Sequence, residues 1–229
     1  MERSAEQVRE NYKRITDRIG EAMAKYRKPE EQVQLMAVTK TVDPALVNVA
    51  VECGVRLLGE NRVQEYESKK AQYDPRAQVQ FIGQLQTNKV KYLIPEISMI
   101  QSVDSLHLAN EVERIAARAG KVQDILLEVN IGGEENKGGI PAEELHGLLE
   151  EAARKPHLHV CGLMTIPPKT DVEKYFFRMQ KLFIDISAEN MDNIDMHVLS
   201  MGMSGDYVEA IKYGSTLVRI GSALFGARG

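Results

Sequence analysis

Short apolar runs alternate with amphipathic segments along almost the whole chain. Each run is bounded by turn residues and is followed by apolar positions at steps of three and four, the pattern of a strand followed by a helix. Eight runs are present, at 33–39, 57–59, 81–83, 99–103, 124–129, 160–165, 198–201 and 217–221. This alternation predicts a parallel sheet covered by helices, and eight units in 229 residues favour closure into a (β/α)8 TIM barrel. An open doubly wound sheet is the alternative.

The helical segments carry recognisable start and stop signals. Residues 4–26 open with Ser4 at a capping-box spacing and continue with apolar residues at helical spacing, so an extra helix is predicted before the first strand. Further helices are expected over 45–53, 105–119, 142–155 and 171–190. No linker, fixed-period repeat or low-complexity tract interrupts this order, so residues 1–229 are predicted to form a single domain.

The charge balance opposes a nucleic-acid partner. The chain has 29 Lys and Arg residues against 33 Asp and Glu residues, and its net charge of −4 gives no positive field for a phosphate backbone. The first ten residues lack the apolar centre of a secretory signal, and no stretch approaches the roughly 20 apolar residues of a membrane span. Cys53 and Cys161 have no CxxC spacing and fit buried thiols in a reducing compartment. We therefore expect a cytoplasmic protein.

Lys40 directly follows the first strand. Period-two alternation places it on the same face as Met36 and Val38, so its side chain is predicted to point into the barrel mouth. Partial burial there favours the neutral amine, which attacks a carbonyl group to form a Schiff base. The alternative is a lysine whose ammonium group simply reaches solvent at the end of a strand.

Small residues and glycines follow the seventh and eighth strands, at 200–206 and 221–226. Barrels commonly build a phosphate site from these two loops, whose backbone N–H groups bind an anion without a net positive charge. Ordinary tight turns are the alternative interpretation.

Arg219 lies within the eighth apolar run. Alternation puts it on the face opposite Val218 and Ile220, inside the barrel, where an isolated cation would be strongly destabilising. One interpretation is a structural partner such as Glu60. The other is a permanent cation that faces a ring nitrogen or a phosphate of a bound ligand.

Three further features have simpler explanations. The glycine-rich segment 132–140 lacks the residue order of a P-loop and is predicted to be a mobile loop over the barrel mouth. His157 and His159 precede the sixth strand, at the end opposite the expected active face, so no metal site is predicted. Asn61 follows the second strand, where it can present an amide to a ligand oxygen while also capping the next helix.

Six segments, taken in order, resemble the pyridoxal phosphate homeostasis protein family, the single-domain relatives of the alanine racemase amino-terminal barrel. They are LMAVTK (35–40), GENRVQE (59–65), FIGQLQTNK (81–89), GLMTIPP (162–168), LSMGMSGD (199–206) and STLVRIGSALFG (215–226). The resemblance covers essentially the full chain and implies pyridoxal 5′-phosphate as the cofactor. The residues that it implies in cofactor binding are Lys40, Asn61, Ser200, Ser204, Arg219, Gly221 and Ser222.

The resemblance also implies a role for each of these residues. Lys40 is the lysine that forms the internal aldimine, and Ser204, Gly221 and Ser222 form the phosphate cradle. Arg219 faces the pyridine nitrogen, while Asn61 and Ser200 are nearby polar contacts. A cation opposite the ring nitrogen disfavours protonation of that nitrogen, which makes the cofactor a poorer electron sink.

The family resemblance implies a cofactor-handling protein in intracellular vitamin B6 homeostasis rather than a catalyst. Racemases with this arginine arrangement use a second base from an additional domain, and we expect no such domain after the eighth strand. The expectation is therefore a monomeric, non-catalytic pyridoxal phosphate carrier, with apo pyridoxal-phosphate enzymes as its partners. The alternatives are a minimal racemase or decarboxylase that uses the same cofactor, and a Schiff-base aldolase that acts on a sugar phosphate.

Overall fold

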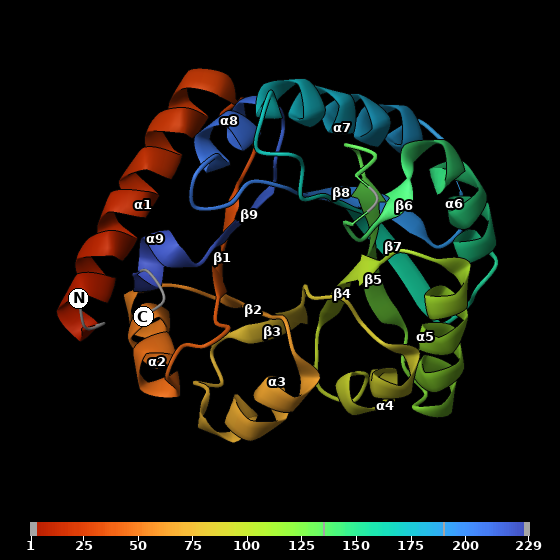
Figure 1. Cartoon of the computed structure of the whole chain (residues 1–229), viewed down its shortest axis with the longest axis horizontal. Helices are drawn as coiled ribbons and strands as arrows, with labels where there is room; N and C mark the ends of the chain where they lie inside the picture. Colours follow the sequence, from red (N-terminus) through yellow and green to blue (C-terminus); the bar gives the residue numbers. More distant parts are fainter. Residues whose placement is uncertain (1–3, 135, 190, 227–229) are drawn as a thin grey trace.

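Parallel strands form a closed ring at the centre of the molecule (Figure 1). The structure, a computed structural model, describes residues 4–134, 136–189 and 191–226. The ring consists of β1 (Gln34–Val38), β2 (Leu57–Glu60), β3 (Gln78–Phe81), β4 (Met99–Val103), β5 (Gln123–Asn130), β7 (Leu158–Met164), β8 (Ile194–Ser200) and β9 (Leu217–Ile220). It closes because β1 pairs with β9 and β4 pairs with β5. The short β6 (Ile140–Pro141) pairs with the end of β5.

Helices surround the ring on its outside (Figure 1). Those that follow the barrel strands are α2 (Pro44–Cys53), α3 (Val63–Lys69), α4 (Val90–Leu93), α5 (Leu106–Arg118), α6 (Leu145–Ala153), α7 (Val172–Ser187), α8 (Tyr207–Lys212) and α9 (Ser222–Phe225). Short 3₁₀ turns cover 70–72, 87–89 and 142–144. This architecture confirms the predicted (β/α)8 barrel and excludes the open sheet. No helix in the described ranges combines the length and the apolar character needed to cross a membrane.

The predicted extra helix is α1 (Ala5–Tyr26), and it begins where the capping signal indicates. The Ser4 hydroxyl oxygen accepts a hydrogen bond from the Gln7 backbone N–H at 3.2 Å. The helix packs against α2, α8 and α9. Because α8 and α9 have only six and four residues, they cover little of the barrel. The apolar face of α1 fills this space, where Val8 and Ile15 are buried in one cluster with Val218.

Two strand boundaries differ from the sequence prediction. β3 spans Gln78–Phe81 rather than 81–83, because its inward position Gln80 is polar and carries no hydrophobic signal. β8 begins at Ile194 rather than at 198, and its first half is partly exposed. In both cases backbone pairing with the neighbouring strands extends a strand beyond its apolar residues.

The barrel interior has an apolar layer and a polar layer. The apolar side chains form one cluster of Met36, Leu57, Ile82, Met99, Leu126, Cys161, Met164, Val198 and Leu217. Arg219, Ser200, Gln80 and Gln101 are buried polar residues joined by hydrogen bonds. The polar layer therefore lies beneath the carboxyl ends of β8 and β9, where a barrel places its binding site.

Gly162 in β7 provides a test of this strand packing. Its φ is +151°, and an added Cβ would stand 1.8 Å from the carbonyl oxygen of Val198 in β8. We expect Gly162→Ala to lower the free energy of unfolding by about 2 kcal/mol or more, measured by urea unfolding. Gly147→Ala in α6 is the control, because a Cβ there meets nothing within 4 Å, and helix propensity should raise stability slightly. Equal midpoints for the two variants would contradict this packing.

Candidate functional site

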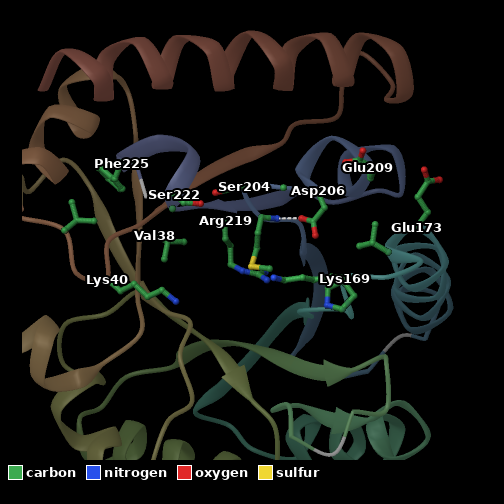
Figure 2. A pocket seen from close by; sticks show the side chains of 17 residues that line it. Val38, Lys40, Lys169, Glu173, Ser204, Asp206, Glu209, Arg219, Ser222 and Phe225 are labelled. Carbon is green, nitrogen blue, oxygen red and sulfur yellow. Dashed lines mark hydrogen bonds between the residues drawn. The ribbon is translucent and has the colours of Figure 1, made fainter. Parts of the chain in front are cut away.

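A cavity of about 820 Å³ lies at the carboxyl ends of β1 and β9, beside the loop after β8. Five of the residues predicted from the sequence line it: Lys40, Ser204, Arg219, Gly221 and Ser222. Figure 2 shows Lys40 and Arg219 reaching into the same space from two different strands. Asn61 and Ser200 are not among the residues that line the cavity. The fold thus brings most of the predicted site together from segments far apart in the chain.

Lys40 reaches the cavity because β1 alternates between the two faces of the barrel wall. Met36 belongs to the interior cluster and Val38 packs against it, whereas Ala37 is buried among the outer helices. Thr39 also faces outward, since its hydroxyl donates to the Glu60 carboxylate at 2.7 Å. The alternation therefore carries the half-buried Lys40 side chain inward, with its amine in the cavity.

Arg219 is a buried cation at the floor of this cavity. Its side chain is 3% exposed, and its guanidinium donates to the Ser200 hydroxyl at 2.6 Å and to the Thr165 carbonyl oxygen at 2.9 Å. Burial lowers the pKa of Arg219 to about 10, which still leaves the group charged at neutral pH. Its contacts use two N–H donors of the five that a guanidinium carries.

Glu60 is not the partner of Arg219, so that interpretation of the sequence is wrong. The Glu60 carboxylate lies on the outer face of β2, where it accepts hydrogen bonds from the hydroxyls of Thr39 and Tyr73. Burial raises the pKa of Glu60 above its usual range. The outward direction follows from strand alternation, because the adjacent Gly59 faces the interior beside Met36.

A chain of hydrogen bonds below the cavity holds the Arg219 guanidinium in place. Ser200 accepts from Arg219 and donates to Gln101 at 2.7 Å, and Gln101 donates in turn to Gln80 at 2.6 Å. All of these side chains are buried. Ser200 is therefore a support beneath the site rather than a residue of its surface.

The loops after β8 and β9 meet at the cavity wall beside the end of β1. The Ser204 hydroxyl oxygen accepts from the Ala223 N–H at 3.1 Å, which joins the first loop to the start of α9. Within the loop after β8, the Asp206 carboxylate accepts a hydrogen bond from the Met203 N–H at 2.6 Å and closes the turn over residues 203–206. Gly221 is the N-cap of α9 and faces Val38 across the cavity wall. Ser204, Gly221 and Ser222 all line the cavity with Arg219, so the start of α9 opens onto it.

Asn61 lies apart from this group. Its side-chain oxygen is buried without a hydrogen-bond partner among the described residues, and its backbone is packed against Gly83. The expectation that Asn61 caps the following helix is wrong, because the N-cap of α3 is Arg62. The orphaned amide oxygen is free to accept from a ligand or a solvent molecule.

The glycine-rich segment after β5 is anchored at its start. The Asn130 side chain donates to the Glu134 carbonyl oxygen at 2.8 Å and accepts from the Glu134 N–H at 3.2 Å. Residue 135 lies outside the described residues. Gly138 and Gly139 lie against β5, where a Cβ on Gly139 would stand 2.6 Å from the Asn130 nitrogen. The predicted mobility of this loop stays a prediction.

Glu128 is a titratable residue near Arg219 that the sequence reasoning missed, although it does not line the cavity. It shares the inward face of β5 with Leu126, and Gly138 lies over its carboxylate. Burial raises the pKa of Glu128 to about 7, and the charge of Asp104 adds to this effect while Arg219 opposes it. The sequence feature that could have indicated Glu128 is its position as an acidic, inward-facing residue near the end of an apolar strand.

The raised pKa of Glu128 predicts a pH dependence of stability in the cofactor-free protein. An unfolded glutamate titrates near pH 4.3, so between about pH 4.5 and 7 the folded state binds the additional proton. The contribution of Glu128 to the free energy of unfolding therefore falls as pH rises through this window. We expect Glu128→Gln to flatten the dependence and to raise stability at pH 8 by about 1–3 kcal/mol.

Urea unfolding at half-unit steps from pH 5 to 8 measures this effect. Glu143→Gln is the control because Glu143 is exposed, and it should reproduce the wild-type profile. A Glu128→Gln profile parallel to that of the wild type would show that Glu128 does not titrate in this window.

Comparison with known proteins finds similarity to one protein family along almost the whole chain. The alanine racemase N-terminal domain family matches residues 5–229. A pyridoxal phosphate homeostasis protein of Aquifex aeolicus is 42% identical over 224 residues, covering 96% of this chain and 97% of that protein. A protein of the same name from Escherichia coli is 31% identical with the same two coverages.

Solved structures show the same barrel. A protein of unknown function from Bifidobacterium adolescentis superposes with a TM-score of 0.92 at 33% identity, covering 96% of this chain and 95% of that chain. PipY of Synechococcus elongatus, solved with PLP bound, superposes with a TM-score of 0.80 at 30% identity, covering 93% and 100%. Alanine racemase from Streptomyces coelicolor, at 18% identity and a TM-score of 0.79, shares the fold, and the match spans 99% of this chain and 59% of that enzyme.

Proposed function

The chain belongs to the pyridoxal phosphate homeostasis proteins of the alanine racemase N-terminal domain family, and on this premise we propose that it binds pyridoxal 5′-phosphate in the cavity above Arg219. The observation that carries the proposal is the meeting of three features in one cavity. The amine of Lys40, the buried cation of Arg219 and the small-residue loops at Ser204 and Gly221 all line it. The PLP-bound PipY structure supports the same ligand.

The residues present fit this cofactor in chemistry and in space. When bound, the cofactor supplies an aldehyde that condenses reversibly with a primary amine. Lys40 offers that amine from the end of β1, and Ser204 and Ser222 line the same cavity at the start of α9. A cavity of about 820 Å³ is within the usual range for a ligand of this size.

Arg219 orients the ligand and limits its chemistry. A guanidinium that is already held by Ser200 and Thr165 can direct a remaining N–H toward the ring nitrogen. With a pKa near 10, Arg219 keeps its own proton, so the ring nitrogen stays an acceptor. An unprotonated ring stabilises a carbanion poorly.

We infer from this that the protein carries the cofactor, supplies it to apo pyridoxal-phosphate enzymes and has no catalytic turnover of its own. The names of its relatives and the position of Arg219 support this inference. A minimal racemase or decarboxylase is the second candidate, and one observation favours it. Glu128 has a pKa near 7 and interacts with Arg219, so it can exchange a proton at neutral pH. However, Glu128 is not among the residues that line the cavity.

We also propose that a single chain, folded as one barrel domain, is the functional unit and acts in the cytoplasm. Cys53 and Cys161 are both free thiols, which fits a reducing compartment.

The first test asks whether Lys40 is the attachment point. We expect the purified protein to be yellow, and borohydride reduction to fix the cofactor mass on Lys40, because its amine extends into the cavity from the end of β1. Peptide mapping by mass spectrometry measures this. Lys40→Ala should lose the visible band while keeping the wild-type circular dichroism spectrum.

Lys169→Ala is the matched control, since Lys169 lines the same cavity. It should keep both the visible band and the adduct on Lys40. An adduct on Lys169 in the wild-type protein would place the covalent link on the other wall of the cavity.

The second test separates a carrier from an enzyme. With a panel of amino acids we expect recovery of unchanged configuration and slow deuterium exchange at Cα, because Arg219 leaves the ring nitrogen unprotonated. Chiral chromatography and mass spectrometry measure both quantities over many protein equivalents. In parallel, the apo form of another pyridoxal-phosphate enzyme should gain activity when mixed with the loaded protein.

Multiple turnovers per barrel with any amino acid would replace the carrier proposal with the minimal-enzyme alternative.

A further inference from the structure

Three side chains with metal-binding atoms meet at the end of the barrel opposite the cavity. Asp124 lies at the start of β5, and His159 and Cys161 lie in the first half of β7. The His159 Nδ1 is 2.9 Å from an Asp124 carboxylate oxygen and 3.4 Å from the Cys161 sulfur. One ligand atom from each of the three residues lies within 4.8 Å of the others.

The register of two neighbouring strands creates this cluster. Asp124 and His159 are direct partners in the β5–β7 ladder, so their side chains leave the sheet on the same face. The pairing then shifts by one residue, because Ile125 pairs with Val160 and Leu126 pairs with Gly162. Cys161 is the additional residue in β7, and its sulfur turns toward His159 on the interior side.

We propose that Asp124, His159 and Cys161 bind a zinc ion at the amino-terminal end of the barrel. One carboxylate oxygen, one imidazole nitrogen and one sulfur form a donor set that zinc accepts, with bonds of about 2.0–2.3 Å. A tetrahedral ion with such bonds needs ligand atoms roughly 3.3–3.8 Å apart, so the observed separations require only side-chain adjustments. A water molecule supplies the fourth ligand, because His159 and Asp124 are 35% and 45% exposed.

Binding breaks the S–H bond of Cys161 and forms a sulfur–zinc bond. The proton is released to solvent, the zinc ion stays divalent, and no electron is transferred. A divalent cation offsets the negative charges of the Asp124 carboxylate and the Cys161 thiolate.

The neighbouring basic groups, Lys121 and His157, bond to other residues and do not occupy the ligand atoms of the cluster. The Lys121 ammonium is near Asp124, but it donates to the carbonyl oxygens of Ile94 and Ile97 at 2.8 and 2.7 Å. His157 points to a different partner, since its Nδ1 is 2.8 Å from the Glu113 carboxylate. The site therefore uses one histidine of the HxH pair, not both.

The position of the cluster indicates a structural role. Asp124 and Cys161 belong to adjacent strands, and a shared ion ties β5 to β7 beside the register shift. The amino-terminal face of a barrel contributes to stability, whereas the cavity with Lys40 lies at the other end. Zinc at this site should thus stabilise the fold independently of the cofactor.

Zinc binding by the untagged, full-length protein tests the proposal directly. After treatment with a chelator, the cofactor-loaded chain is dialysed against micromolar Zn²⁺ and its metal content is measured by mass spectrometry. We expect one zinc ion per chain, and at least tenfold weaker binding for each of Cys161→Ala, His159→Gln and Asp124→Asn. Zinc should raise the melting temperature of the wild type and not that of Cys161→Ala.

Two matched variants serve as controls. Cys53→Ala removes the other thiol and His157→Gln removes the other histidine of the pair, and both should keep one zinc ion per chain. X-ray absorption at the zinc edge of the wild type should show one sulfur at about 2.3 Å with nitrogen and oxygen neighbours. This measurement does not depend on any variant folding.

Two results would overturn the proposal. One is unchanged zinc content in Asp124→Asn and Cys161→Ala, or loss of zinc in His157→Gln instead. The other is a wild-type zinc spectrum without sulfur, or zinc content no higher than in the dialysis buffer.

Discussion

The burial of one positive charge determines the hydrogen bonding inside the barrel near the carboxyl ends of its strands. Arg219 is almost fully enclosed, and an unpaired cation there would cost several kcal/mol, so the neighbouring strands must supply acceptors. They do so with a hydroxyl from β8 and a backbone carbonyl from the end of β7 rather than with a carboxylate. Gln101 and Gln80 extend the same network across β4 and β3. The result is a rigid polar floor on which the cavity rests.

The lengths of the helices explain why the cavity opens where it does. α8 and α9 are the short helices that follow β8 and β9, and their loops of small residues leave space above Arg219. The outer surface that these helices do not cover is packed by α1, which contacts α2, α8 and α9 (Figure 1). The additional helix thus stabilises the strands that carry the site, although none of its residues lines the cavity.

The two ends of the barrel place their titratable groups in different surroundings. At the carboxyl end, Glu128 and Arg219 interact in a buried region, and each shifts the pKa of the other. At the amino end, the carboxylate of Asp124 and the imidazole of His159 keep contact with solvent beside a buried thiol. At the carboxyl end, the buried charge of Arg219 can interact with a ligand that enters the cavity. At the amino end, oxygen, nitrogen and sulfur donors can bind a metal ion that arrives from solvent.

The alternation of strands and helices, the extra first helix and the inward direction of Lys40 and Arg219 could all be predicted from the sequence, because they depend on periodicity within single segments. The sequence did not locate the start of β3, whose inward residue is polar. The contacts between strands had to come from the fold: Ser200 and Thr165, not Glu60, hold Arg219, Glu128 lies near Arg219, and Cys161 lies beside His159. These features depend on the register between strands, including the one-residue shift at Cys161, and the periodicity of one strand carries no information about its alignment with the next.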